Sequence, residues 1–68
     1  MNSFWILIIS VILPNGKIQI HDQIKFDDYE KCNYTANHKV IEDTYTKVFF
    51  PNEIKIYCVP DEESHGEK

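Results

Sequence analysis

Residues 4–26 read FWILIISVILPNGKIQIHDQIKF, and this stretch decides the fold. Two apolar-rich segments flank Asn15-Gly16, the preferred pair for a two-residue type I′ turn, in which both positions need a positive φ. That turn fixes a series of facing pairs along the two segments: Leu13 with Ile18, Val11 with Ile20, Ile9 with Asp22, Leu7 with Ile24 and Trp5 with Phe26. Nine of these ten residues are apolar, so the register set by the turn also gathers one hydrophobic face. The stretch therefore predicts a β-hairpin.

The opposite face of this hairpin differs between its two strands. The second strand places polar side chains there, as an edge strand exposed to water does: Lys17, Gln19, His21, Gln23 and Lys25. The first strand places mostly apolar side chains there: Phe4, Ile6, Ile8, Ser10 and Ile12. A strand that is apolar on both sides is usually central in its sheet. We therefore expect a third strand on the other side of the first.

Residues 27–48 carry a helical pattern. Asp27 can cap the first backbone N–H groups, with Glu30 at the third position of a capping box. One stripe at helical spacing should then lie on the sheet: Tyr29, Cys32, Ala36, Val40, Thr44 and Val48. We prefer a single helix through about Val48. The alternative is a strand over residues 44–50, which are rich in β-branched and aromatic residues, with a second hairpin at Pro51-Asn52.

Residues 53–60, EIKIYCVP, follow the break at Pro51-Asn52 and are interpreted as the last strand. The predicted fold class is α+β, with the order ββαβ, a three-stranded antiparallel sheet of order 2-1-3 and one helix packed on one face. A chain of 68 residues makes one small domain that buries only about 60% of its unfolded surface. We place this domain at residues 1–60. Residues 61–68 hold four acidic residues and no apolar one, so we expect an acidic disordered tail.

Charge and hydropathy narrow the possible partners and compartments. The net charge is −4, and the seven basic residues are scattered lysines, so no basic stripe exists for nucleic acid. Residues 4–13 are too few to span a bilayer, which takes about 20 residues. They also lack a preceding Lys or Arg and a following A-x-A-like cleavage site. We expect no nucleic-acid or membrane partner and a cytoplasmic location in the host cell, with secretion as the alternative.

The two cysteines have two possible roles. Cys32 lies on the sheet-facing side of the predicted helix and Cys58 on the core side of the last strand. A disulfide between them would contribute about 3.5 kcal/mol on the chain-entropy estimate. The alternative is a pair of buried thiols that act as small hydrophobes.

Neither a metal site nor an active site emerges from the pattern. Zinc takes four N or S ligands, yet His21 is expected on the outward face of the hairpin, His38 well round the helix from Cys32, and His65 in the tail. There is no GxSxG, no Gly-rich phosphate loop and no HExxH. We expect no metal, no cofactor and no enzymatic activity.

The remaining candidate for a functional site is a binding surface, and one face of the predicted sheet is the strongest candidate. A single helix covers one face only, so the other face exposes six apolar side chains, which we predict to bind a partner: Phe4, Ile6, Ile8, Ile12, Tyr57 and Val59. A second stripe lies on the predicted helix and is interpreted as a flank of the core or a coiled-coil-like seam: Tyr34, His38, Ile41 and Tyr45.

Three features together resemble short accessory proteins encoded by phages and prophages. These are the apolar first strand with its Asn15-Gly16 turn, the segment 26–32 (FDDYEKC) and the closing segment 57–60 (YCVP). The resemblance implies an accessory role, and some such proteins, anti-CRISPR proteins among them, block host defence by binding a host protein. The predicted function is a small non-enzymatic inhibitor or modulator of a host defence protein. The alternatives are a homo-oligomer, such as a homodimer, and a secreted disulfide-bridged domain.

Overall fold

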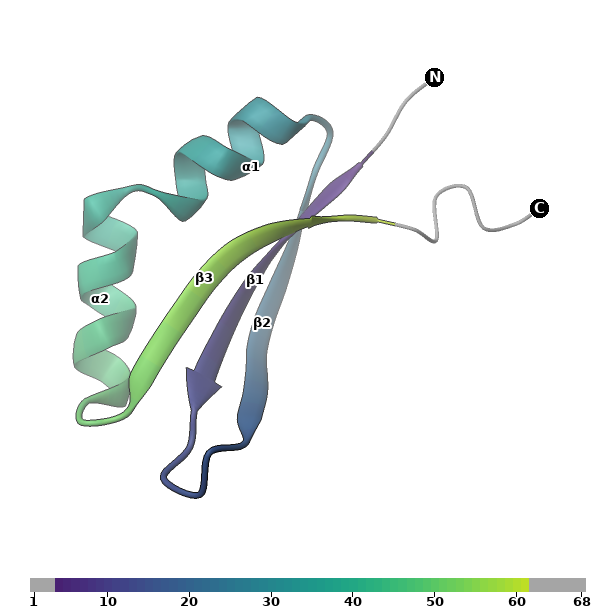
Figure 1. The fold of residues 1–68 in the computed structure, drawn as a ribbon. Coiled ribbons are helices and arrows are strands. Elements are labelled where there is room, and N and C mark those ends of the chain that lie inside the picture. The colour runs from purple at the N-terminus through teal and green to yellow at the C-terminus, as the bar shows by residue number, and fades with distance from the viewer. Residues whose placement is uncertain (1–3, 62–68) are drawn as a thin grey trace.

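The fold is a small α+β domain, seen in a computed structural model that describes residues 4–61 (Figure 1). Its elements follow in the order β1 (Trp5–Ile12), β2 (Ile18–Phe26), α1 (Tyr29–Ala36), α2 (Lys39–Phe49) and β3 (Glu53–Pro60). The three strands form one antiparallel sheet in the order β2-β1-β3. The predicted fold class and strand order are thus confirmed. Within residues 4–61, neither helix is long and apolar enough to cross a bilayer.

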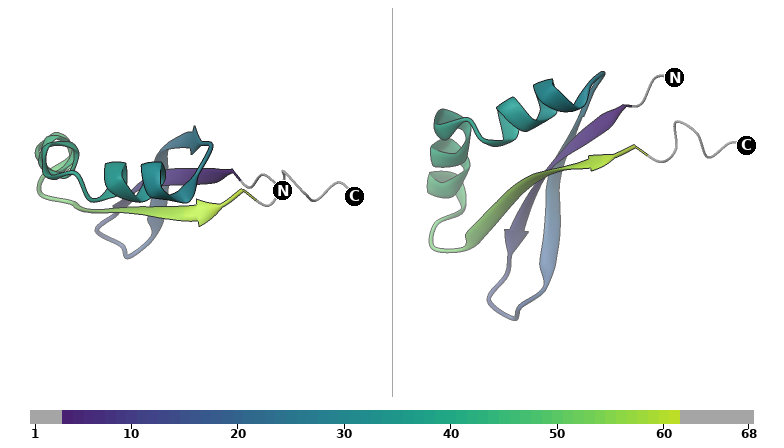
Figure 2. Two further views of the ribbon diagram at one scale, coloured as in Figure 1. Left: turned by 90° about the horizontal axis from the view of Figure 1, so that it is seen from above. Right: turned by 45° about the horizontal axis from the view of Figure 1, so that its top comes forward.

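The core lies between the sheet and the helices. Leu7 and Ile9 from the central strand cluster with Cys32 from α1, and all three are fully buried. Partly buried side chains from all five elements pack around them: Trp5, Phe26, Ala36, Tyr45, Ile56 and Cys58. Because successive side chains of a strand point to opposite faces, this cluster identifies the inner face of the sheet. On that side α1 runs across the strands, and α2 lies beside β3 (Figures 1 and 2).

The hairpin turn differs from the predicted two-residue turn. The Gly16 N–H donates to the Leu13 carbonyl at 2.8 Å, and the Leu13 N–H donates to the Lys17 carbonyl at 2.8 Å. The loop therefore has three residues, Pro14, Asn15 and Gly16. Among the described residues only Gly16 has a positive φ, at 88°, so the predicted type I′ turn is wrong. Proline fixes the φ that the first central position of a type I turn needs, and glycine then takes the left-handed position.

This longer loop changes the register of half of the hairpin. Next to the turn Ile12 faces Ile18 and Ser10 faces Ile20, so the predicted pairings of Leu13 with Ile18 and of Val11 with Ile20 are both wrong. The register shifts between Ile9 and Ser10, where His21 is the extra residue of a β-bulge on β2. Beyond the bulge the predicted pairing is confirmed, from Ile9 with Asp22 to Trp5 with Phe26.

Gly16→Ala is expected to lower the free energy of unfolding by about 1 kcal/mol, because a side chain in the left-handed region meets its own backbone. No atom lies within 4 Å of the added Cβ, so the loss of stability would come from the backbone conformation alone. Gly16→Asn is the matched control and should lose less, since asparagine tolerates that region. Urea unfolding of both variants measures the difference, and an Ala variant as stable as the wild type would contradict this turn geometry.

The single helix predicted for residues 27–48 is instead two helices. Asp28, not Asp27, caps α1, and its carboxylate accepts from the Lys31 N–H at 2.8 Å. α1 ends at Ala36 with Asn37 as its C-cap, and His38 caps α2 by accepting the Val40 N–H on Nδ1 at 3.3 Å. Polar side chains that bond to nearby backbone groups compete with helix continuation, which accounts for the break. The alternative of a strand over residues 44–50 is wrong, because α2 continues to Phe49.

The break also rotates α2 relative to the predicted stripe. Cys32 and Ala36 face the core as predicted. Beyond Asn37 the predicted inward residues face outward, and Val40 and Val48 are each 64% exposed. The half-buried side of α2 instead carries Ile41, Tyr45 and Phe49. These three residues are spaced four apart, which places them on one face of a helix.

The domain extends one residue further than the predicted boundary at residue 60. Asp61 is only 5% exposed, and its N–H donates to the Phe4 carbonyl at 2.9 Å. Its carboxylate lies 3.1 Å from the Lys25 ammonium. Asp61 therefore belongs to the folded domain rather than to a tail. The remainder of the predicted tail, residues 62–68, lies outside the described residues.

Candidate functional site: the outer face of the sheet

The side of the sheet away from the helices, here called the outer face, is the candidate site. Strand pairing brings its residues together: Ile6 faces Val59 and Ile8 faces Tyr57 across β1 and β3. Across β1 and β2, Ile12 faces Ile18. No element of residues 4–61 covers this face (Figure 2).

The structure places all six predicted partner-binding residues on the outer face. Tyr57 is 38% exposed. The other five are half-buried by their neighbours on the same face: Phe4, Ile6, Ile8, Ile12 and Val59. The prediction that they bind a partner stays a prediction. Their gathering on one surface follows from strand alternation and the confirmed strand order.

Two further apolar residues lie on the outer face that the predicted register had assigned to the core. Ile18 is 60% exposed and Ile20 is 44% exposed. The three-residue turn brings them there, because a one-residue change of register moves a strand's side chains to the other face. The signal in the sequence was Pro14, which extends the Asn15-Gly16 pair into a longer loop.

The eight apolar residues form a diagonal band across the outer face. The band begins at Val59 and Tyr57 on β3, crosses β1, and ends at Ile18 and Ile20 on β2. Polar side chains occupy the two corners beside it. Gln23 and Lys25 lie at one corner, and the other holds Glu53 and Lys55.

Ser10 lies in the middle of this band, yet it leaves no unsatisfied polar group. Its side chain is buried, at 1% exposure, and its hydroxyl donates to the Lys55 carbonyl at 3.1 Å. Because a buried hydroxyl costs free energy mainly when it lacks a hydrogen-bond partner, Ser10 is compatible with a dry interface over the band.

At one end of the outer face, side chains from three chain segments contact one another. The Lys25 ammonium on β2 pairs with Asp61, which follows β3, and lies 4.7 Å from the ring centroid of Phe4. The Lys25 side chain stays 58% exposed, so the pair adds little to stability. Its main consequence is to hold Phe4 and the end of β3 on the same face as Lys25.

His21 lies on the inner side, so its predicted place on the outward face is wrong. Its ring packs edge-on against Phe49, with centroids 4.8 Å apart, and against Tyr45 at 5.8 Å. The bulge turns His21 from the outer side toward α2. His21 therefore does not contribute to the outer face. On that face of β2, Ile20 is the side chain next to the bulge.

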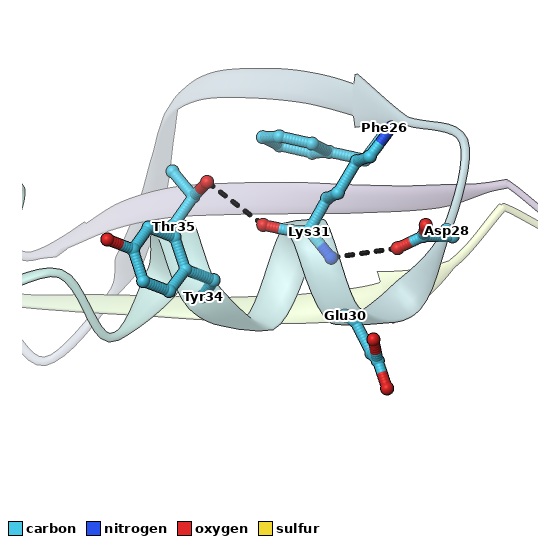
Figure 3. Close-up of a pocket in the computed structure, with 6 residues that line it drawn as sticks. All are labelled: Phe26, Asp28, Glu30, Lys31, Tyr34 and Thr35. Carbon is cyan, nitrogen blue, oxygen red and sulfur yellow. Dashed lines mark hydrogen bonds between the residues drawn. The ribbon is translucent and has the colours of Figure 1, made fainter.

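A shallow hollow of about 440 Å³ beside α1 is a weaker candidate (Figure 3). Its lining combines two aromatic rings with polar side chains: Phe26, Asp28, Glu30, Lys31, Tyr34 and Thr35. Asp28 caps the helix, and the Thr35 hydroxyl donates to the Lys31 carbonyl at 2.9 Å. Glu30 points away from the two rings in Figure 3. Asp28 and Thr35 thus bond to the helix backbone, the Lys31 ammonium pairs with Asp27, and the polar groups do not converge on one point.

Cys32 and Cys58 form a disulfide between α1 and β3, with their Cα atoms 6.2 Å apart. Of the two roles open from the sequence, the structure shows the bridge. In the part of the chain that the structure describes, no group of three or more His, Cys, Asp or Glu side chains could hold a metal ion.

Comparison with family models, curated proteins and solved structures finds no match for this chain. The candidate site therefore rests on geometry alone.

Proposed function

We propose that this chain is a small non-enzymatic binding protein whose outer sheet face docks onto a protein partner. The observation that carries the proposal is the diagonal band of eight apolar side chains on a face that no described element covers. Three strands about 4.8 Å apart and eight residues long, at about 3.3 Å per residue, give the whole outer face roughly 380 Å². The apolar band takes the larger part of that area, and the polar corners take the rest. Exposed apolar patches of a few hundred Å² commonly mark interaction sites.

The make-up of the face favours a protein partner. An apolar centre with a polar rim is the usual anatomy of a protein–protein interface, and the corners beside the band supply such a rim with Gln23, Lys25, Glu53 and Lys55. The two lysines lie at opposite corners, and one of them is paired with Asp61. This arrangement gives no continuous track for phosphates, which nucleic-acid binding needs.

The resemblance to phage and prophage accessory proteins supports a narrower form of the proposal. In that form the partner is a host defence protein, and the outer face occludes or alters one of its surfaces.

Lysine substitutions on the band test the proposal. Ile18→Lys and Ile20→Lys change side chains that are already 60% and 44% exposed, so the monomer should stay folded. Each should weaken partner binding at least about tenfold, because a charge would be buried without a counter-charge. The readout is capture of partners by the immobilised chain from a lysate of the organism that carries the gene, with circular dichroism to verify the fold.

Val48→Lys is the matched control for this experiment. Val48 is 64% exposed but lies on the outward side of α2, in the opposite layer of the domain. Proteins captured through the outer face should be retained by the Val48→Lys variant and lost by both isoleucine variants. Equal retention by all three variants would contradict the assignment of the face.

A second copy of the chain is the alternative occupant of the same face. Two-fold dimers bury the same patch on both subunits, and the apolar band is available for that role. Sedimentation of the full chain at micromolar concentration separates the two proposals. A chain that stays monomeric would eliminate the homodimer. A dimer that Ile18→Lys dissociates would show instead that a second copy of the chain, and not a different protein, occupies the face.

A further inference from the structure

The helical layer is held on the sheet by very little fully buried surface. Of all the side chains in α1 and α2, only Cys32 is buried, and α2 contributes none. Cys32 is at 0% exposure in the core cluster, where it is bonded to Cys58 of β3. The most buried contact between the helical layer and the sheet is therefore also a covalent bond.

The other contacts of this layer are made by side chains that remain partly in water. Trp5 packs against Tyr29 with centroids 4.7 Å apart, yet Tyr29 is 47% exposed. His21, which packs against Tyr45 and Phe49, is itself an exposed residue. Hydrophobic stabilisation scales with the apolar area removed from water, so these contacts stabilise the layer less than a fully buried set would.

We propose that the Cys32–Cys58 bridge is a redox-sensitive latch that keeps the helical layer, and with it the folded domain, in place only while it is oxidised. This inference goes beyond the proposed binding role and does not depend on it. The bridge joins residues 26 apart in sequence, so it removes the entropy of an open loop from the unfolded chain.

Opening the latch requires a dithiol reductant. A thiolate of the dithiol attacks one bridge sulfur, which releases one cysteine thiolate and leaves a mixed disulfide. The second thiol of the reductant then attacks that mixed disulfide, so the products are two cysteine thiols and the oxidised, cyclic reductant. Two electrons and two protons pass to the protein. Such reductants keep thiols reduced in the cytosol and are scarce in secretory and extracellular spaces.

Urea unfolding of the full chain, followed by far-UV circular dichroism with and without dithiothreitol, tests the latch. Reduction should lower the folding equilibrium constant about 300-fold on the loop-entropy estimate, which corresponds to about 3.5 kcal/mol at 1.4 kcal/mol per factor of ten. The urea midpoint should fall by about 2–3 M. The gain of two hydrogen atoms in the intact mass verifies that the bridge has opened.

The Cys32→Ala/Cys58→Ala variant separates bridge loss from other effects of the reductant. Its low midpoint should not change with dithiothreitol, whereas the wild-type midpoint should. If the double variant is too unstable to show a transition, that result supports the latch as well. A fully reduced wild type whose midpoint stays within about 0.5 M of the oxidised form would overturn the proposal.

Discussion

Leu7→Ala is expected to lower the free energy of unfolding by about 3 kcal/mol, within the range found for large-to-small changes at buried sites. Leu7 is at 0% exposure on the central strand, where it faces Ile24 on one side and Cys58 on the other. Both neighbouring strands and the disulfide hold the walls of the resulting cavity in place, so the site cannot collapse to refill it. Urea unfolding measures the loss.

Ile18→Ala is the control for Leu7→Ala. It also shortens a branched aliphatic side chain on the sheet, but at a position that is 60% exposed on the outer face. The expected change is within about 0.5 kcal/mol, as for other exposed substitutions. A loss at Ile18 as large as the loss at Leu7 would show that Ile18 is buried and that the inner and outer faces have been assigned wrongly.

Phe49→Ala and Val48→Ala form the second large contrast, because Phe49 lies on the half-buried side of α2 and Val48 on its exposed side. Phe49 is half-buried, and its ring packs against His21 at 4.8 Å. Its truncation should cost about 2 kcal/mol, less than for a fully buried phenylalanine. Val48 is 64% exposed, and its truncation should cost less than about 0.5 kcal/mol.

The same pair distinguishes the two possible phases of the helix. A continuous helix from residue 29 would turn Val48 toward the sheet and Phe49 away from it. Thermal or urea unfolding that ranks Val48→Ala as the more damaging change would therefore contradict the break at Asn37-His38 and restore the single helix.

Much of the architecture could be predicted because the pattern of apolar residues along a strand indicates which of its faces are buried, and therefore where the strand lies in the sheet. The first strand is apolar on both sides, which identified it as central and gave the order β2-β1-β3. Pro51-Asn52 marked the start of the last strand, whose observed bounds are Glu53–Pro60. In both cases the apolar pattern of a strand agreed with a turn-forming pair of residues at one end of it.

The errors arose where a single residue decides between two local geometries. Asn15-Gly16 suits a two-residue turn, and only the proline before it indicates the three-residue loop that forms. Likewise, the apolar stripe runs on through residue 48, and only the side-chain bonds made at Asn37 and His38 end the first helix and begin the second. The turn shifts the hairpin register by one residue as far as the bulge, and the helix break rotates α2 by part of a turn.

The candidate site contains both residues that the sequence predicted and residues that it missed. Five of its six predicted residues lie on β1 and β3, whose pairing has no shift between Trp5–Pro60 and Ile12–Glu53, and Phe4 directly precedes β1. The two that were missed, Ile18 and Ile20, lie between the turn and the bulge, where the predicted register is out of phase. Alternation can place a residue on a face only when the register is known.

The central claim is that Ile18 and Ile20 lie on the outer face, and the pairing of backbone protons across the hairpin tests it most directly. In a nuclear Overhauser spectrum of the oxidised chain, cross-strand contacts should join Ile12 with Ile18 and Ser10 with Ile20, since opposed residues lie only about 4.5–5.5 Å apart. Contacts that join Leu13 with Ile18 and Val11 with Ile20 would contradict the account, because both isoleucines would then turn inward and the apolar band would be broken.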